Sequence, residues 1–286
     1  MDSGRERPLN TRSGRFAALE WRNSAGPRTL CLHGWLDNAA SFIPLAQQLQ
    51  PLDLVALDLA GHGHSQHRPR GTKYYFMDNL WDLDAVLDKL GWPDCHLLGH
   101  SMGGGVACMF AAAAPERVRK LVLLDGLGQV SARPEEALER LRKSRDSVRN
   151  ATRKLREFPD IKAAVAARQA VSQLSDMSAR LLCERSLEPF QDHFRWRTDP
   201  ALNWHSPSLM SEQQVLALLA AIEAPTLCLT AQPLVRWIDP DAARRRLETV
   251  PDCRNLWIEG HHHFHMESAV EIAPAILDFL LGKETD

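Results

Sequence analysis

A serine between glycines is the residue of this sequence best suited to nucleophilic chemistry. Residues 99–103 read G-x-S-x-G and place Ser101 between an apolar run and a helix-like segment that begins at Met102. A tight strand-to-helix turn of this kind strains the serine backbone, and the small glycines let the neighbouring elements pack closely. The hydroxyl is then exposed, and the N-terminus of the following helix favours negative charge that develops beside it. We therefore predict that Ser101 is a nucleophile that forms an acyl-enzyme.

Acyl transfer at a serine also needs two hydrogen-bond donors that point at the new oxyanion. The first expected donor is the backbone N–H of Met102, the residue after the nucleophile. The second should come from the loop after an earlier strand, and one apolar run ends just before Gly34 and Trp35. Because a glycine permits the necessary turn, we expect the N–H of Trp35 to be the second donor.

A proton acceptor for Ser101 is expected in a run of histidines near the C-terminus. Four histidines lie within residues 260–265, after a strand-like run and before a helix-like segment at 267–281. The order serine, acid, histidine along the chain is typical of this type of turn, and a histidine at 261–265 satisfies it. No carboxylate or cysteine stands at metal-ligand spacing beside these histidines, so the sequence predicts no metal site and implies no cofactor.

The carboxylate that would orient the histidine has two candidates. Asp125 ends an apolar run at 120–125, and one right-handed crossover places that run beside the strand of Ser101, at the same edge of the sheet. The other usual position, the loop after the run at 226–231, offers no carboxylate, and Asp239 follows a few residues later. We expect Asp125 to be the acid, with Asp239 as the alternative.

The elements that must position these residues follow from the apolar pattern. Short runs of consecutive apolar residues, bounded by Gly, Pro or Asp, are typical of strands buried on both faces of a parallel sheet. Helical patterns separate several of them, which predicts an α/β fold with right-handed crossovers. Asp58 ends one of these runs, and we expect it and the glycine-rich turn at 61–65 to brace the site. The runs are 28–33, 52–58, 95–100, 120–125, 226–231 and 254–258, and the helical patterns are 38–50, 77–90 and 102–114.

The alternation of strands and helices stops between about residues 128 and 222. This stretch is rich in Arg, Glu, Leu and Ala and contains no convincing strand. We therefore predict a core of residues 1–127 and 223–286 and a helical cap of residues 128–222, inserted between two strands. The aromatic residues of the cap either line an apolar substrate site or pack the cap onto the core. They are Phe190, Phe194, Trp196 and Trp204.

The composition places further bounds on function. Among 286 residues, 44% are hydrophobic and 24% charged, and the formal net charge is -2. These values are ordinary for a globular protein and favour neither a nucleic-acid nor a membrane partner. Residues 1–15 are polar and basic, unlike a signal peptide, and the six cysteines include no C-x-x-C pair. We therefore expect a cytoplasmic monomer or homodimer with reduced cysteines that acts on a small-molecule acyl substrate.

Taken together, these motifs resemble the α/β-hydrolase superfamily. The resemblance implies a mostly parallel sheet of about eight strands, flanked by helices, with an inserted helical cap. It also selects the base, because residues 262–267 are similar to the family's H-x-x-H-x-E, whose first histidine corresponds to His262. Segments 124–128 and 196–200 resemble the serine hydrolase-like branch. The motifs occur in the family's order across about residues 16–286, at 33–35, 58–65, 99–104, 115–118, 123–126 and 262–267.

The sequence therefore predicts a serine hydrolase that cleaves a carboxylic ester, or a related acyl bond, of a small and apolar substrate. A serine nucleophile argues against dehalogenase or epoxide hydrolase activity, which requires a carboxylate nucleophile in this fold. Thioester, lactone, amide and carbon–carbon bond hydrolysis use the same residues and remain open. Many family members carry Asp after the strand at 226–231, and this chain does not. That departure motivates an alternative of another class, a non-catalytic ligand-binding protein on a degenerate hydrolase fold.

Overall fold

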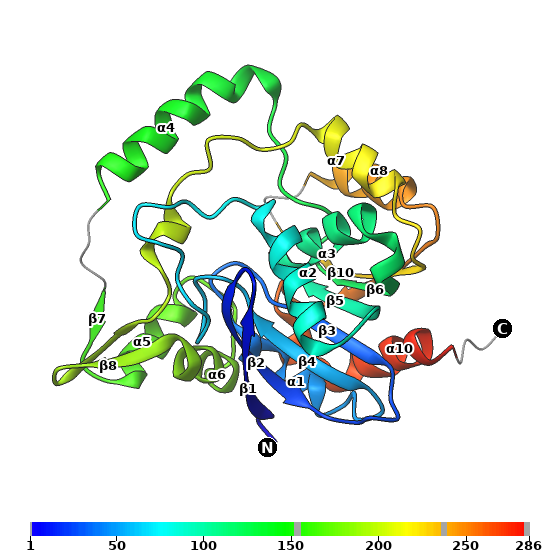
Figure 1. Cartoon of the computed structure of the whole chain (residues 1–286), viewed down its shortest axis with the longest axis horizontal. Coiled ribbons are helices and arrows are strands. Elements are labelled where there is room, and N and C mark those ends of the chain that lie inside the picture. Colours follow the sequence, from blue (N-terminus) through cyan, green and yellow to red (C-terminus); the bar gives the residue numbers. More distant parts are fainter. Residues whose placement is uncertain (1, 152–155, 236–238, 283–286) are drawn as a thin grey trace.

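Eight strands form the central sheet in the computed structural model, which describes residues 2–151, 156–235 and 239–282 (Figure 1). Only β2 runs against the others, because it pairs antiparallel with both of its neighbours while the remaining pairs are parallel. The mostly parallel, eight-stranded sheet is therefore confirmed. In spatial order the strands are β1 (Arg5–Thr11), β2 (Gly14–Trp21), β4 (Asp53–Asp58), β3 (Arg28–Leu32), β5 (Cys95–His100), β6 (Val118–Leu124), β10 (Thr226–Gln232) and β11 (Cys253–Glu259).

The two N-terminal strands were not among the expected elements. The six apolar runs of the sequence correspond to the other six strands, and β1 and β2 add a hairpin at one edge. Strand β1 carries charged residues that are largely exposed, and Arg5 and Arg7 both pair with the buried Glu20 of β2. Charged edge strands are common because they discourage pairing with other chains. Such strands lack the apolar run from which a strand is recognised in the sequence.

Helices cover both faces of the sheet. Neighbouring residues of a strand point to opposite faces, so Leu97 packs under one group of helices and Leu98 under the other. The expected helix at 38–50 is shorter than predicted, a 3-10 turn followed by α1. Among the described residues, no helix combines the length and apolar character needed to cross a membrane. One face carries α2 (Asp78–Leu90), α3 (Met102–Ala113), α7 (Glu212–Ala220) and α8 (Pro240–Thr249), and the other carries α1 (Ile43–Ala46), α9 (Phe264–Glu267) and α10 (Ala269–Leu281).

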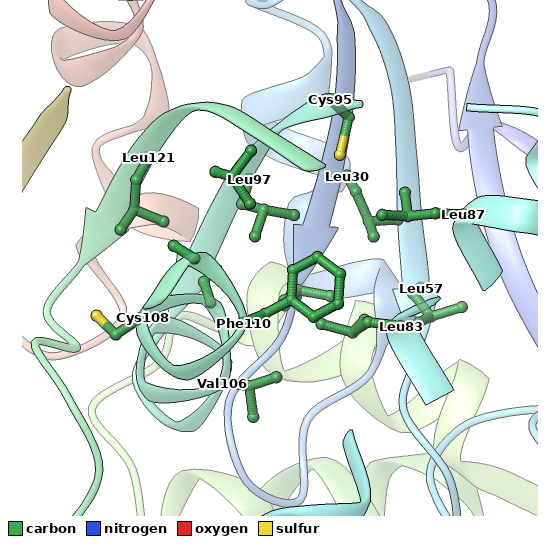
Figure 2. Close-up of a cluster of buried hydrophobic side chains, with 14 of the residues drawn as sticks. Leu30, Leu57, Leu83, Leu87, Cys95, Leu97, Val106, Cys108, Phe110 and Leu121 are labelled. Atoms are coloured by element: carbon green, nitrogen blue, oxygen red, sulfur yellow. The ribbon is translucent and has the colours of Figure 1, made fainter. Parts of the chain in front are cut away.

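The core beneath α3 is closely packed. Figure 2 shows Phe110 of α3 pointing toward leucines of the sheet and of α2, among them Leu30, Leu57 and Leu83. Phe110 is 2% exposed. Because α3 begins at the residue after Ser101, this packing fixes the helix on which the proposed nucleophile depends.

The region predicted as a cap contains strands, so the expectation of a purely helical segment is wrong. Strands β7 (Glu157–Phe158), β8 (Leu187–Phe190) and β9 (His193–Trp196) form an antiparallel sheet with β9 in the middle. They have two to four residues each, too few for an alternating pattern to be recognised. The helices α4 (Ala137–Arg149), α5 (Ile161–Gln169) and α6 (Asp176–Ser186) complete the region, with α4 at the periphery (Figure 1).

The division into core and cap stays a prediction. Helix α7 falls inside the predicted range 128–222, yet it lies on the sheet against α3 and α8. A separate apolar cluster that includes Phe158, Val165 and Leu182 holds α5, α6 and the three short strands together. Residues 152–155 of the predicted cap, and 1, 236–238 and 283–286 of the predicted core, lie outside the described residues.

A buried ion cluster joins α6 to the sheet. The Nε atom of Arg185 lies 3.0 and 2.9 Å from the two carboxylate oxygens of Asp58, and the same guanidinium pairs with Glu6 of β1. Burial alone would lower the pKa of Arg185, but Asp58 and Glu6 raise it above its usual value. Asp58 is fully buried, so removal of its cation would leave an uncompensated charge in the interior.

The packing of α3 yields a stability prediction. We expect Phe110→Ala to lower the free energy of unfolding by about 3–5 kcal/mol, because it leaves a cavity that the surrounding leucines only partly fill. Urea denaturation followed by circular dichroism measures this loss. Val270→Ala on α10, where the side chain is 68% exposed, is the matched control and should change stability by no more than about 0.5 kcal/mol. Equal losses in the two variants would contradict the prediction.

Candidate active site

Ser101 occupies a strained turn between β5 and α3. Its backbone has φ 50° and ψ −116°, and its N–H donates to the carbonyl of Leu124 at 3.0 Å. A Cβ atom at Gly103 would lie 2.1 Å from the carbonyl oxygen of Leu32, and one at Gly126 would lie 2.4 Å from the oxygen of Ser101. Because no side chain fits in these gaps, the glycines are what allows the strands and α3 to meet at the serine.

His262 lies in the loop between β11 and α9 and contacts the serine directly. Its Nε2 is 2.8 Å from Ser101 Oγ, and its Nδ1 is 2.6 Å from Asp125 Oδ2. An ionised carboxylate only accepts hydrogen bonds, so Nδ1 carries the proton and Nε2 is left to accept from the hydroxyl. The structure therefore joins three of the predicted site residues, Ser101, His262 and Asp125, in one chain of hydrogen bonds. Of the neighbouring histidines, His261 is exposed, whereas His263 and His265 are buried.

Asp125 is held rigidly beside the serine. It follows β6 with φ 48°, its N–H donates to Leu229 at 2.8 Å, and its Oδ1 accepts from the N–H of Ala231 at 3.1 Å. The alternative acid, Asp239, instead caps α8, where its Oδ2 accepts from the N–H of Ala242 at 3.0 Å. The geometry thus pairs His262 with Asp125.

The two expected oxyanion donors border the same cavity as Ser101. Met102 is the first residue of α3, where a backbone N–H has no partner within the helix. The loop of Trp35 is fixed by its neighbour Leu36, whose N–H donates to Nε2 of His62 at 3.2 Å. Burial, with His33 beside it, lowers the pKa of His62 to about 3, so the ring stays neutral and accepts this hydrogen bond.

The turn after β4 supports the loop that contains Trp35. Asp58 accepts hydrogen bonds from the N–H groups of Ala39 at 2.7 Å and His64 at 2.8 Å. His33 links the two segments, because its Nε2 accepts from Leu59 at 3.0 Å and its Nδ1 donates to Gly34 at 2.7 Å. Asp58 and the turn at 61–65 therefore act as the structural support that the sequence suggested.

A cavity of about 620 Å³ lies over Ser101. Its wall includes Tyr74, Tyr75 and Phe76, which precede α2 and which no motif had indicated. Two arginines also line it, and their charges are offset: Arg68 pairs with Asp82 at 2.8 Å, and Arg246 with Glu212 at 2.6 Å. The remaining wall is largely aliphatic and aromatic, with Leu59, Leu127, Leu202, Leu209, Leu247 and Trp204 among its residues.

The four aromatic residues of the predicted cap have different positions. Trp204 lines the cavity over Ser101 and also a second cavity of about 570 Å³. Trp196 borders the second cavity and packs edge-on against Phe158 at 5.0 Å between ring centroids. Phe194 joins the apolar cluster of the cap, and Phe190 lies under the guanidinium of Arg195 at 4.2 Å. Both expected roles of these aromatics, lining a site and packing the cap, therefore occur.

Comparison with known proteins identifies the family. A family model described as "alpha/beta hydrolase fold" matches residues 27–231. The chain belongs to the α/β-hydrolase family. This hydrolase is 33% identical to a "Serine hydrolase-like protein" of Danio rerio, over 96% of the chain and 87% of the relative. The expected likeness to the serine hydrolase-like branch is thereby confirmed.

Solved structures of related chains agree with this family. The hydrolase is 34% identical to a hypothetical protein from Pseudomonas aeruginosa PAO1, with a TM-score of 0.90 over 96% of this chain and 99% of that one. It is 27% identical to a thioesterase domain from the curacin biosynthetic pathway, with a TM-score of 0.84 over 96% and 98% of the two chains.

The backbone of Ser101 yields a second prediction. Ser101→Gly and Ser101→Ala both remove the hydroxyl, but only glycine adopts this positive φ without steric cost. We expect the glycine variant of the hydrolase to be more stable than the alanine variant by about 1 kcal/mol in urea denaturation. The control is Ala112→Gly within α3, where the helical backbone should give the opposite sign. An alanine variant as stable as the glycine variant would contradict strain at Ser101.

Proposed function

We propose that this chain is a serine hydrolase that cleaves a carboxylic ester of a small, largely apolar substrate through an acyl-enzyme on Ser101. The observation that carries the proposal is the row of hydrogen bonds from Asp125 through His262 to Ser101, at 2.6 and 2.8 Å. A nucleophile, a base and an orienting carboxylate in this order are what acyl transfer requires. Membership of the α/β-hydrolase family supports it.

In the acylation step, His262 Nε2 takes the hydroxyl proton as Ser101 Oγ attacks the ester carbonyl carbon. Asp125 accepts the Nδ1–H hydrogen bond and stabilises the imidazolium that forms. The N–H groups of Trp35 and Met102 donate to the oxyanion of the tetrahedral intermediate. The intermediate collapses when His262 returns its proton to the leaving alkoxide, and the acyl group stays on Ser101.

Deacylation repeats the same proton movements with water. His262 removes a proton from a water molecule, whose oxygen attacks the acyl carbon. The second tetrahedral intermediate is held by the same two donors, and His262 then protonates Ser101 Oγ. The carboxylic acid leaves, and Ser101 and His262 return to their starting protonation states.

The cavity supports an uncharged, apolar substrate. Its aliphatic and aromatic wall offers contact to a hydrocarbon or aromatic acyl group, and both arginines in it are already paired with carboxylates. A substrate carboxylate would have to displace Asp82 from Arg68 or Glu212 from Arg246. A volume of about 620 Å³ suits a small molecule of the size that such clefts bind.

Thioester hydrolysis is the second candidate function. The observation that favours it is the 27% identity to a thioesterase domain across almost the whole chain. The same residues would act, with a thiolate as the leaving group. A thiolate is a weaker base than an alkoxide and needs less help from His262 to leave, but His262 activates Ser101 in both reactions, so the ratio of the kcat/KM values for matched ester and thioester substrates separates the two candidates.

The non-catalytic alternative, a ligand-binding protein on a degenerate fold, rested on the missing carboxylate after β10. The 2.6 Å contact between Asp125 and His262 supports Asp125 as a replacement acid and weakens the motive for that alternative. Tight binding of a small carbonyl compound to the folded chain without any acylation of Ser101 would favour it.

The proposal predicts that short-chain p-nitrophenyl esters are hydrolysed and that the activity depends on two side chains. Ser101→Ala and His262→Ala should each lower kcat/KM by at least about a thousandfold, because the residues act as one unit. His261→Ala, a change to an exposed neighbour in the same histidine run, is the matched control and should retain activity.

The same assay runs in parallel with acyl thioesters, whose released thiol is measured colorimetrically. A thioester preferred by several orders of magnitude would favour the second candidate. A folded wild-type chain that gives neither turnover nor an acyl-enzyme burst on either substrate class, at several chain lengths, would overturn both.

A further prediction separates the two acid candidates. Asp125→Asn should lower kcat by up to about 10⁴-fold, because an amide opposite Nδ1 favours the wrong imidazole tautomer. Asp239→Asn should leave kcat close to that of the wild type, because Asp239 caps α8 and asparagine also caps helices well. The reverse ranking of the two variants would assign the acid role to Asp239.

A further inference from the structure

A buried cluster of one carboxylate and two imidazoles lies behind the proposed catalytic residues. Asp37, His100 and His263 each offer one ligand atom, and these atoms lie within 4.8 Å of one another. The contacts to Asp37 Oδ2 are made by His100 Nδ1 and His263 Nε2. The side chains of Asp37 and His100 are each 1% exposed, and that of His263 is 11% exposed. The cluster is therefore almost fully shielded from solvent, with His263 as its most exposed member.

One nitrogen of this cluster has no hydrogen-bond partner. His100 Nε2 lies 2.9 Å from the carbonyl oxygen of His262, which can only accept, so Nε2 carries the ring proton. The other nitrogen, Nδ1, then holds a lone pair in the neutral ring. It makes no hydrogen bond and faces Asp37 Oδ2 at 3.7 Å. A lone pair opposite a buried carboxylate is unfavourable, and a cation between the two would be attracted to both.

Two of the donor–donor distances and the outer contacts resemble those of metal ligands. Donor atoms bound at about 2.0–2.1 Å in a tetrahedral zinc site lie about 3.3 Å apart. Asp37 Oδ2 is 3.2 Å from His263 Nε2 and 3.7 Å from His100 Nδ1. Metal-ligating histidines usually donate their second N–H to a carbonyl or carboxylate, and ligating carboxylates are themselves hydrogen-bonded. His100 donates to a backbone carbonyl, and Arg168 of α5 holds Asp37 Oδ1, which leaves Oδ2 toward the imidazoles.

We propose that Asp37, His100 and His263 bind a divalent transition-metal ion of the zinc type, with water at the fourth position. Imidazole nitrogen and carboxylate oxygen are ligands that such ions accept. His263 Nε2 now donates its proton to Asp37 Oδ2 in a hydrogen bond; when the ion binds Nε2, the neutral ring carries its proton on Nδ1 instead. This inference does not depend on the substrate or on the bond that the hydrolase cleaves.

The ion would connect three loops of the active site. Asp37 is two residues after Trp35, His100 directly precedes Ser101, and His263 directly follows His262. Asp37, His100 and His263 are not among the described residues that line the 620 Å³ cavity, so the ion lies behind the catalytic row and does not face the substrate. Its role is to clamp the oxyanion loop, the serine turn and the histidine loop together.

The test is a metal titration of the whole chain. Protein stripped with a chelator and dialysed is titrated with Zn²⁺ by isothermal calorimetry, and with Co²⁺ by visible absorption. We expect one ion per chain and a higher melting temperature of the loaded protein. The Co²⁺ spectrum should show the visible bands of a four-coordinate ion with nitrogen and oxygen ligands. A thiolate charge-transfer band, or the absence of stoichiometric binding, would overturn the proposal without the need for any variant.

Variants locate the ion. His263→Gln and Asp37→Asn should each weaken binding by at least about tenfold, since loss of an outer-shell partner alone costs that much. His261→Gln is the control from the same histidine run and should bind normally. His262→Ala should also bind normally, and this distinguishes the cluster from the catalytic histidine. Asp37→Asn also removes the ion pair with Arg168, so circular dichroism checks that this variant is folded. His263→Gln leaves the Asp37–Arg168 pair in place and tests the same site without that change. Binding that is lost in His262→Ala but kept in His263→Gln, or kept in both ligand variants, would refute the assignment.

Discussion

The close approach of backbones at Ser101 is the constraint on which the rest of the site depends. Gly103 lets α3 touch the end of β3, and Gly126 lets the chain after β6 touch the serine carbonyl, in both cases at distances that no Cβ atom permits. The serine therefore stands where the ends of three strands converge. Trp35 follows β3, Ser101 follows β5, Asp125 follows β6 and His262 follows β11, so every proposed catalytic group comes from the carboxyl end of a strand in one sheet.

The parts of this arrangement that depend on short, fully buried segments could be predicted from the sequence. Strands β3, β4, β5, β6 and β10 carry consecutive apolar positions because both of their faces are covered, and each appears as a run. Strand β11 lies at the edge of the sheet and is partly exposed, and its shorter apolar run at 256–258 is enough to indicate it. Asp125 could be identified because one crossover rule places its strand beside that of Ser101. The register agrees, with His100 opposite Leu124.

The parts that could not be predicted depend on partial exposure or on distant contacts. The hairpin of β1 and β2 and the short strands β7 to β9 lack a recognisable apolar run. His262 and His263 are adjacent, yet one contacts Ser101 and the other Asp37, a difference that arises from loop geometry and not from residue type. The sequence gives no indication of the proposed metal site because Asp37, whose Oδ2 lies 3.2 Å from His263 Nε2, is 226 residues away along the chain. Similarly, only the folded chain brings Tyr74 and Phe76 into the cavity wall.

The Asp58–Arg185 pair has a consequence for the order of events during synthesis. The two residues are 127 positions apart, with the carboxylate made first. At about 5–20 residues per second, the ribosome needs on the order of 10 s to reach the arginine. During that interval the nascent sheet cannot exclude water from Asp58, because a lone carboxylate keeps its hydration shell. The carboxyl end of β4 therefore becomes fully dry only after α6 has emerged and docked, so this part of the sheet waits for a helix encoded far downstream.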